Sequence, residues 1–321
     1  MSSPPLEHMK IAPYYWYDGN VVERDRVSVD PYAHTLHYGS GVFEGIRAYR
    51  TARGAGVFRL REHMERFARS AEVYQIDLKW DVATLCDAVV EGLARNELDS
   101  AYIRPLAFLG EGTVSLAPRS LCEAHVLIAY RALGNYFGAG QENGIRATIS
   151  PWQKFSSKAM PATVKGCGHY ANSVLAMQDA VRRGFNEAIL LNDRGEIAEG
   201  TGENVFVVKN GTLLTNDRSA DVLLGITRAS VLDLARDFGI ATEIGPISVD
   251  ALLEADEVFF TGTAVEVTPL ICVDDHVYPS ARPISARLRA AYLRAVAGED
   301  ERHPAWVTLV RPAAEAMPTV A

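Results

Sequence analysis

The chain lacks several features that mark common functional classes. It has only four cysteines in 321 residues, with no C-x-x-C pair among them, so neither a disulfide framework nor a zinc site is indicated. No apolar run approaches the roughly 18 residues of a membrane span. The first twelve residues carry prolines and charges instead of the apolar segment of a secretory signal. These absences favour a soluble, cytoplasmic protein with no membrane partner.

Basic residues are in the minority. There are 32 Lys and Arg against 40 Asp and Glu, a net charge of −8, with no basic stripe. This balance argues against nucleic acid as a partner and favours small-molecule chemistry. The length exceeds the roughly 250 to 300 residues at which a single hydrophobic core stops growing, so two domains are expected.

Short strand patterns alternate with helical patterns in the first half, which predicts a small α+β domain over residues 1–130. Strands are expected at 14–17, 42–49, 102–109 and 124–130, and helices at 61–74 and 82–94. Four glycines then break the periodicity of 131–144, which is typical of an interdomain loop. Its aromatic pair, Tyr136 and Phe137, either folds over a site or packs between domains.

The remainder, 145–321, is expected to form a larger domain. Helices are expected at 170–183 and 228–238, and strands at 145–150, 187–191, 204–209, 212–214 and 257–260.

Lys165 opens the run Lys-Gly-Cys-Gly-His-Tyr (165–170), a small-residue stretch expected to be exposed just before a helix. Glu199 opens the acidic, Gly-rich turn Glu-Gly-Thr-Gly-Glu-Asn (199–204). A pyridoxal phosphate enzyme needs an amine for its Schiff base and an anion that keeps the pyridine nitrogen protonated. Taken alone, however, a lysine such as Lys165 is more often a solvated surface residue.

Two further turns suit anions. Gly225, Ile226 and Thr227 lead directly into a helix, where backbone N–H groups, the helix dipole and a hydroxyl together suit a phosphate. An ordinary Thr cap is the alternative. The turn 261–264 follows a strand and either presents N–H groups to a carboxylate or simply ends the strand.

Two other polar patterns do not favour a functional site. Arg59 and Arg61, at the start of a helix, are interpreted as solvated. His34 and His37 have no third ligand at helical spacing, so a turn histidine beside an aromatic ring is favoured over a metal site.

Together these segments resemble the branched-chain amino acid aminotransferases, a group of fold-type IV pyridoxal phosphate enzymes. The resemblance extends in family order from about residue 14 to residue 307 and is carried by 37–47, 61–66, 102–105, 165–172, 199–204, 225–228 and 261–264. It implies an α+β, two-domain transaminase with a smaller N-terminal α/β domain, an interdomain loop and a larger C-terminal domain with a β-barrel-like core. It also implies a homodimer or higher homo-oligomer, in which the loop after Arg104 and Pro105 reaches the site of the other subunit.

The resemblance implies roles around the cofactor, pyridoxal 5'-phosphate. Lys165 would form the Schiff base and move the proton, Glu199 would pair with the ring nitrogen, and Tyr170 would bond the phenolic oxygen. The phosphate would be held by Arg66, Ile226, Thr227 and Thr263.

On the substrate side, the resemblance assigns the α-carboxylate to Tyr102 with the N–H groups of Thr263 and Ala264. The distal carboxylate of glutamate would be taken by Arg104, Tyr38 and Tyr136. An aliphatic side chain would be enclosed by Phe43, Gly45 and Tyr170, with Leu116 in the substrate loop. In that loop Ser115 stands where the family usually has glycine, which puts the range of substrate lengths in doubt.

The implied activity is transamination between L-branched-chain amino acids and 2-oxoglutarate, giving 2-oxo acids and L-glutamate. A D-amino acid transaminase, an (R)-amine transaminase or an aminodeoxychorismate lyase would use the same scaffold. A non-catalytic binding protein of the same fold is disfavoured because both Lys165 and Glu199 are present.

Overall fold

The computed structural model describes residues 10–133, 138 and 140–310, which divide into two compact units. The lysine unit, named for Lys165, consists of 10–133, 164–168 and 294–310. The glutamate unit, named for Glu199, consists of the other described residues up to 293. No helix within these described ranges has the length and apolar character needed to cross a membrane.

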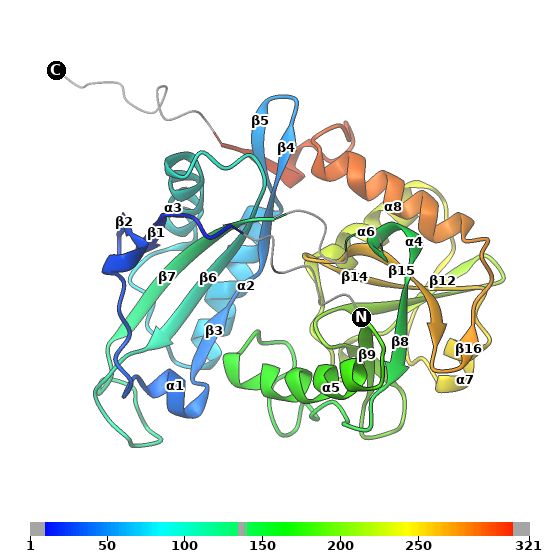
Figure 1. The fold of residues 1–321 in the computed structure, drawn as a ribbon, viewed down its shortest axis with the longest axis horizontal. Helices are drawn as coiled ribbons and strands as arrows, with labels where there is room; N and C mark the ends of the chain where they lie inside the picture. Colours follow the sequence, from blue (N-terminus) through cyan, green and yellow to red (C-terminus); the bar gives the residue numbers. More distant parts are fainter. Residues whose placement is uncertain (1–9, 134–137, 139, 311–321) are drawn as a thin grey trace. The chain divides into compact units, whose positions relative to one another are not determined.

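Strands of the lysine unit form an antiparallel sheet in the order β17-β5-β4-β6-β7-β1-β2, with β3 paired to β6. Their bounds are β1 Tyr14–Tyr17, β2 Asn20–Glu23, β3 Gly41–Phe43, β4 Ile46–Thr51, β5 Gly54–Phe58, β6 Ala101–Leu109, β7 Ala124–Ala132 and β17 Val307–Leu309. The helices are α1 His34–Tyr38, α2 Leu60–Val73 and α3 Val82–Arg95. Figure 1 shows α2 and α3 beside this sheet, which they cover with an apolar face.

Helical spacing explains that face. Leu60, Met64, Phe67 and Ala71 recur every three or four residues along α2 and are all buried. Arg59, just before α2, was expected to be solvated, and that expectation is wrong. Its guanidinium lies 4.9 Å from the Trp306 ring centroid, and its side chain is only 13% exposed.

The strand expected over 42–49 is divided into β3 and β4. The break falls at Glu44 and Gly45, where the Glu44 N–H donates to the Pro105 carbonyl at 2.9 Å. The Glu44 carboxylate is completely buried, and a Cβ on Gly45 would lie 2.4 Å from the Tyr102 hydroxyl. A buried charge and a close ring approach therefore interrupt the regular alternation of a strand.

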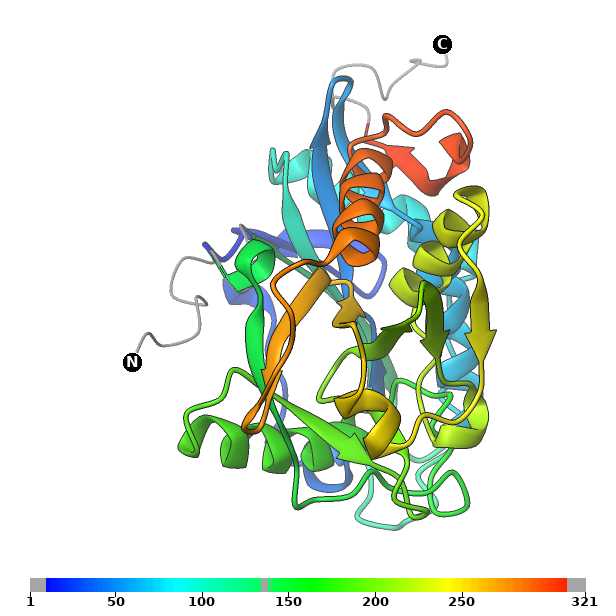
Figure 2. The same cartoon turned by 90° about the vertical axis from the view of Figure 1, so that its right-hand side faces the viewer.

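Strands of the glutamate unit form a mixed sheet in the order β10-β9-β8-β15-β14-β11-β12-β13, with β16 paired to β15. Their bounds are β8 Ile145–Ile149, β9 Glu187–Leu191, β10 Ile197–Gly200, β11 Asn204–Lys209, β12 Thr212–Thr215, β13 Thr242–Ile244, β14 Glu257–Gly262, β15 Glu266–Val273 and β16 His276–Val277. Figure 2 shows β8 beside β15, two strands far apart in the sequence that pair in parallel.

Helices of the glutamate unit are α4 Gly140–Asn143, α5 Tyr170–Arg182, α6 Ile226–Asp237 and α7 Val249–Leu253, and α8 Pro283–Val296 continues into the lysine unit. The strand β11 is apolar on both faces: Val205 and Val207 lie in the main core, and Phe206 stacks on Phe259 at 5.1 Å. The predicted α+β class is confirmed, while β10, β15 and α8 were not predicted.

Candidate active site

Lys165 lies in an enclosed part of the lysine unit, so the prediction of an exposed stretch is wrong. Its carbonyl accepts the N–H of Phe43 at 3.0 Å, and its own N–H donates to Ser70 Oγ at 3.2 Å. A Cβ on Gly166 would lie 2.6 Å from the Tyr74 hydroxyl. The small residues around Lys165 therefore serve close packing and not exposure.

The amine of Lys165 has an altered acidity. Burial, with the positive charge of Arg66 acting in the same direction, lowers its pKa to about 8. The Nζ atom lies 5.1 Å from the centroid of the Phe43 ring. A much larger fraction of this amine is therefore neutral near pH 7.5 than for a solvated lysine, as a nucleophile or proton acceptor requires.

Arg66 is held by a buried acid that the sequence analysis missed. Its Nε and Nη2 donate to the two oxygens of Glu44 at 2.6 and 2.9 Å, and His63 Nδ1 lies 2.8 Å from Glu44 Oε2. Burial opposes ionisation of Glu44, but Arg66 and His63 hold its pKa well below the usual range. The sequence did contain a signal for this pair: Glu44 lies inside an apolar strand pattern, and a carboxylate that is buried there needs a partner.

Glu44→Ala is expected to destabilise the protein by about 3 to 5 kcal/mol, because it removes the buried carboxylate that accepts two hydrogen bonds from the Arg66 guanidinium. The measurement is denaturant unfolding. Glu65→Ala is the matched control: Glu65 lies beside Arg66 on α2 but pairs with the 71% exposed Arg61. An exposed pair contributes at most about 1 kcal/mol. Equal losses in the two variants would contradict a structural role for the buried pair.

Three predicted substrate residues are brought together in the lysine unit. Arg104 Nη2 donates to the Tyr102 hydroxyl at 2.6 Å, and its guanidinium lies 4.5 Å from the Phe43 ring centroid. Arg104 is exposed at this point of β6. A cation is thus fixed against two aromatic rings while its outer edge is available to an anion.

The predicted substrate loop is attached to α1. The Tyr38 hydroxyl donates to the Val114 carbonyl at 3.1 Å, and His34 Nε2 lies 3.0 Å from the Ser115 carbonyl. Because a carbonyl only accepts, His34 must donate from Nε2 there. The His34 ring also lies 4.6 Å from the Tyr38 ring, so the expectation of a histidine beside an aromatic is confirmed, in a short helix instead of a turn.

Ser115 adopts a conformation open to any residue, since it has no positive φ. Its Oγ accepts the N–H of Ala117 at 3.2 Å. The neighbouring Leu116 is 80% exposed. The serine therefore introduces no backbone strain.

Tyr136, predicted to help Arg104, lies outside the described residues.

Glu199 is buried on β10, in the glutamate unit. The register of β10 against β9 shifts between Ile197 and Glu199, and such a shift re-aims a side chain. Its Oε1 lies 2.6 Å from Lys154 Nζ, and its Oε2 accepts the N–H of Leu223 at 3.1 Å. Lys154 was also missed, because no local pattern distinguishes it from a surface lysine.

The start of α6 has no side-chain cap. The N-cap is Gly225, which has no side chain to cap the helix, and Thr227 is the second helical residue. The alternative of an ordinary Thr cap is therefore wrong. The Gly225 N–H donates to Asn204 Oδ1 at 3.0 Å, and a Cβ on Gly225 would lie 2.2 Å from that oxygen. The N–H groups of the first helical turn, Ile226 and Thr227 included, have no partner within the helix and suit a phosphate.

Asn204 also connects this helix start to the second predicted turn. It pairs with Thr261 in the ladder between β11 and β14, and Thr263 and Ala264 follow in the turn that leads to β15. The hydroxyl of Thr261 is buried and has no hydrogen-bond partner among the described residues.

Tyr170 is the first residue of α5.

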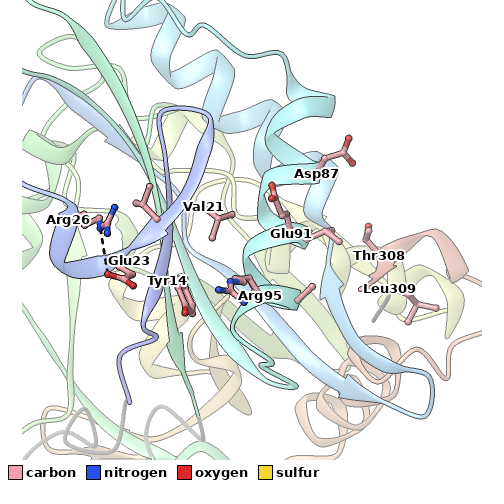
Figure 3. Close-up of a pocket in the computed structure, with 12 residues that line it drawn as sticks. Tyr14, Val21, Glu23, Arg26, Asp87, Glu91, Arg95, Thr308 and Leu309 are labelled. Carbon is pink, nitrogen blue, oxygen red and sulfur yellow. Dashed lines mark ion pairs between the residues drawn. The ribbon is translucent and has the colours of Figure 1, made fainter. Parts of the chain in front are cut away.

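A groove of about 900 Å³ lies elsewhere in the lysine unit, lined by parts of β1, β2, α3 and β17 (Figure 3). Arg26 pairs there with Glu23 at 3.6 Å, and the Arg95 guanidinium lies 4.2 Å from the Tyr14 ring centroid. None of the predicted site residues lines this groove.

Comparisons with known proteins show the family of the chain. The family model for amino-transferase class IV matches residues 41–271. The branched-chain-amino-acid aminotransferase of Escherichia coli K12 is 38% identical over 304 residues, which cover 94% of this chain and 98% of that protein. The chain belongs to the class IV aminotransferase family.

Solved structures of branched-chain aminotransferases share the fold of this chain. The branched-chain aminotransferase of the archaeon Thermoproteus uzoniensis with norvaline is 39% identical, with a TM-score of 0.90 over 94% of this chain and 100% of that one. The branched-chain amino acid aminotransferase of Thermobaculum terrenum in its pyridoxal phosphate form is 29% identical, with a TM-score of 0.88 over 94% and 99% of the two chains. The predicted family and the predicted fold-type IV architecture are confirmed.

Proposed function

We propose that this protein is a pyridoxal phosphate enzyme that transfers amino groups between L-branched-chain amino acids and 2-oxoglutarate. The observation that carries the proposal is Lys165: a partly buried amine whose pKa burial lowers to about 8, in the lysine unit that also contains Arg66 and Arg104. The names of relatives at 38 and 39% identity support the substrate class.

The residues fit the cofactor. Arg66, the open helix start at Ile226 and Thr227, and the turn at Thr263 offer donors for a phosphate, and Glu199 offers a buried carboxylate for a ring nitrogen. When bound, the cofactor supplies an electron sink that makes the substrate Cα–H acidic. Lys165 would accept the Cα proton of the substrate and deliver it to C4′ of the cofactor. Tyr170 would bond the phenolic oxygen of the ring.

Substrate recognition follows from the same groups. Tyr102, with the N–H groups of Thr263 and Ala264, would hold the α-carboxylate. Arg104 would hold the distal carboxylate of glutamate, helped by Tyr38 and Tyr136. Phe43 and Gly45, with Tyr170 and Leu116, would enclose an aliphatic side chain. A transaminase for apolar amines would give Arg104 no carboxylate, which disfavours that alternative.

We also propose that the enzyme is a cytoplasmic homodimer. Val114 and Leu116 are 72% and 80% exposed on a loop that the Tyr38 hydroxyl holds against α1, where a second subunit would cover them. All four cysteines are free thiols, as expected in a reducing compartment.

A spectrophotometric half-reaction tests the activity. The cofactor-loaded protein is titrated separately with L-leucine, L-glutamate, D-alanine and (R)-1-phenylethylamine, and conversion of the cofactor to its amine form is followed by absorbance. Conversion by L-leucine and L-glutamate alone is expected. Conversion by D-alanine or by the amine instead would move the activity to another member of the same family.

A further inference from the structure

Lys154 makes an ion pair that the proposed chemistry does not use. Its Nζ lies 2.6 Å from Glu199 Oε1, and the two side chains are only 8% and 10% exposed. The backbone N–H of Lys154 donates to the Leu191 carbonyl at 2.8 Å, and its Nζ lies 4.3 Å from the Phe155 ring centroid. The ammonium group is therefore held in place between a carboxylate and an aromatic face, with little access to water.

Stability alone is a poor explanation for this pair. Burying an ammonium and a carboxylate removes hydration from both, and that cost offsets most of their attraction. Apolar side chains of similar size would often stabilise such a position equally well. The effect of the Lys154 charge on Glu199 is therefore a better explanation for the pair than stability.

Glu199 has room for another donor. A carboxylate offers about four lone-pair positions. Lys154 and the Leu223 N–H, which lies 3.1 Å from Oε2, are bonded to one oxygen each. If the proposed function holds, the ring nitrogen of pyridoxal phosphate is a third donor to the same group.

The location of the proton decides whether that ring works as an electron sink. In a buried pair of a carboxylate and a pyridine nitrogen, a lone carboxylate is costly to keep charged and would take the proton from the ring. A fixed cation in contact with the carboxylate stabilises its charged form. The proton then remains on the nitrogen.

We propose that Lys154 is a positioning residue that keeps Glu199 charged and correctly oriented, so that the proton of the pair stays on the ring nitrogen of the cofactor. It acts through Glu199. The inference rests on the proposed cofactor but not on the identity of the amino acid substrate.

Nitrogen-15 NMR of the enzyme loaded with ring-labelled pyridoxal phosphate tests this directly, because the ring signal differs strongly between the protonated and unprotonated nitrogen. Lys154→Gln keeps an N–H donor for Glu199 but removes the charge, and Lys154→Arg keeps both. The ring nitrogen should be protonated in the parent and in the Arg variant. In the Gln variant the ring nitrogen should lose more than half of that protonation. The leucine half-reaction should slow by about 10- to 100-fold, the loss that is typical when a residue that orients a metal ligand is replaced.

Lys158→Gln is the matched control, since Lys158 is exposed in the same segment, and it should leave both readouts unchanged. A Gln variant whose ring nitrogen stays fully protonated would overturn the proposal, even if its stability falls. If Lys154→Gln does not fold, Lys154→His replaces it. Unlike Lys or Arg, an imidazole can lose its charge as the pH rises through the range where the enzyme is handled, so the ring signal should follow the pH in this variant alone. The NMR signal needs no substrate, so its result is separate from success or failure of the half-reactions.

Discussion

Lys165→Ala is expected to abolish transamination, with a loss of at least about 10⁴-fold in turnover, because the variant loses the covalent anchor and the proton carrier together. The measurement is single-turnover kinetics with L-leucine. Lys79→Ala is the matched control, since Lys79 belongs to the same unit, is 51% exposed and pairs with Glu123. It should keep parental turnover. Near-normal turnover in Lys165→Ala would rule out the proposed role.

The lowered pKa of Lys165 predicts how the rate of its reaction with the cofactor changes with pH. Its pKa is lowered to about 8, so the amine is mainly protonated below that pH and mainly neutral above it. Reaction of the cofactor-free protein with pyridoxal phosphate should therefore accelerate as the pH rises from about 6 towards about 8 and then level off. An ordinary solvated lysine would continue to gain reactivity up to about pH 10.

Local patterns predicted much of the fold. The strands 187–191 and 204–209 have the predicted bounds, because short apolar runs between turn signals leave few alternatives. The helix expected at 170–183 ends one residue earlier, at Arg182, close to Gly184. These elements are determined mainly by residues close together in the sequence, and the spacing of apolar residues reports such local preferences.

Pairs distant in the sequence were not predictable in the same way. Glu44 and Arg66 are 22 residues apart and make two hydrogen bonds, while Lys154 and Glu199 meet from different segments of the glutamate unit. No periodicity connects such residues. The strand break at Glu44 and the enclosed position of Lys165 both follow from tertiary contacts, which is why the corresponding predictions were wrong.

The roles of the matched positions came from the resemblance, and the structure adds a physical reason for two of the glycines among them. Gly45 is needed because the Tyr102 hydroxyl occupies the space of a Cβ. Gly225 is needed because Asn204 Oδ1 does the same at the start of α6. In both places a ring or an amide important to the site lies against a backbone that has no side chain.

Arg104→Ala is expected to impair the half-reaction with L-glutamate far more than the half-reaction with L-leucine, because only glutamate carries a second carboxylate. One hydrogen-bonded contact to a charged group contributes about 1.5 to 3 kcal/mol, which corresponds to a loss of about 10- to 150-fold in kcat/KM for glutamate. The leucine half-reaction should change by less than about threefold, the effect of a loosened Tyr102, whose hydroxyl accepts from Arg104 at 2.6 Å.

Arg131→Ala provides the control for this experiment. Arg131 is an exposed arginine on β7 and lies directly opposite Tyr102 in the strand ladder, so its removal perturbs the same part of the sheet without removing the Arg104 charge. Both half-reactions should remain parental in that variant. If Arg104→Ala slows leucine and glutamate equally, Arg104 acts on the α-carboxylate or on the cofactor, and dual recognition of aliphatic and acidic side chains must come from another residue.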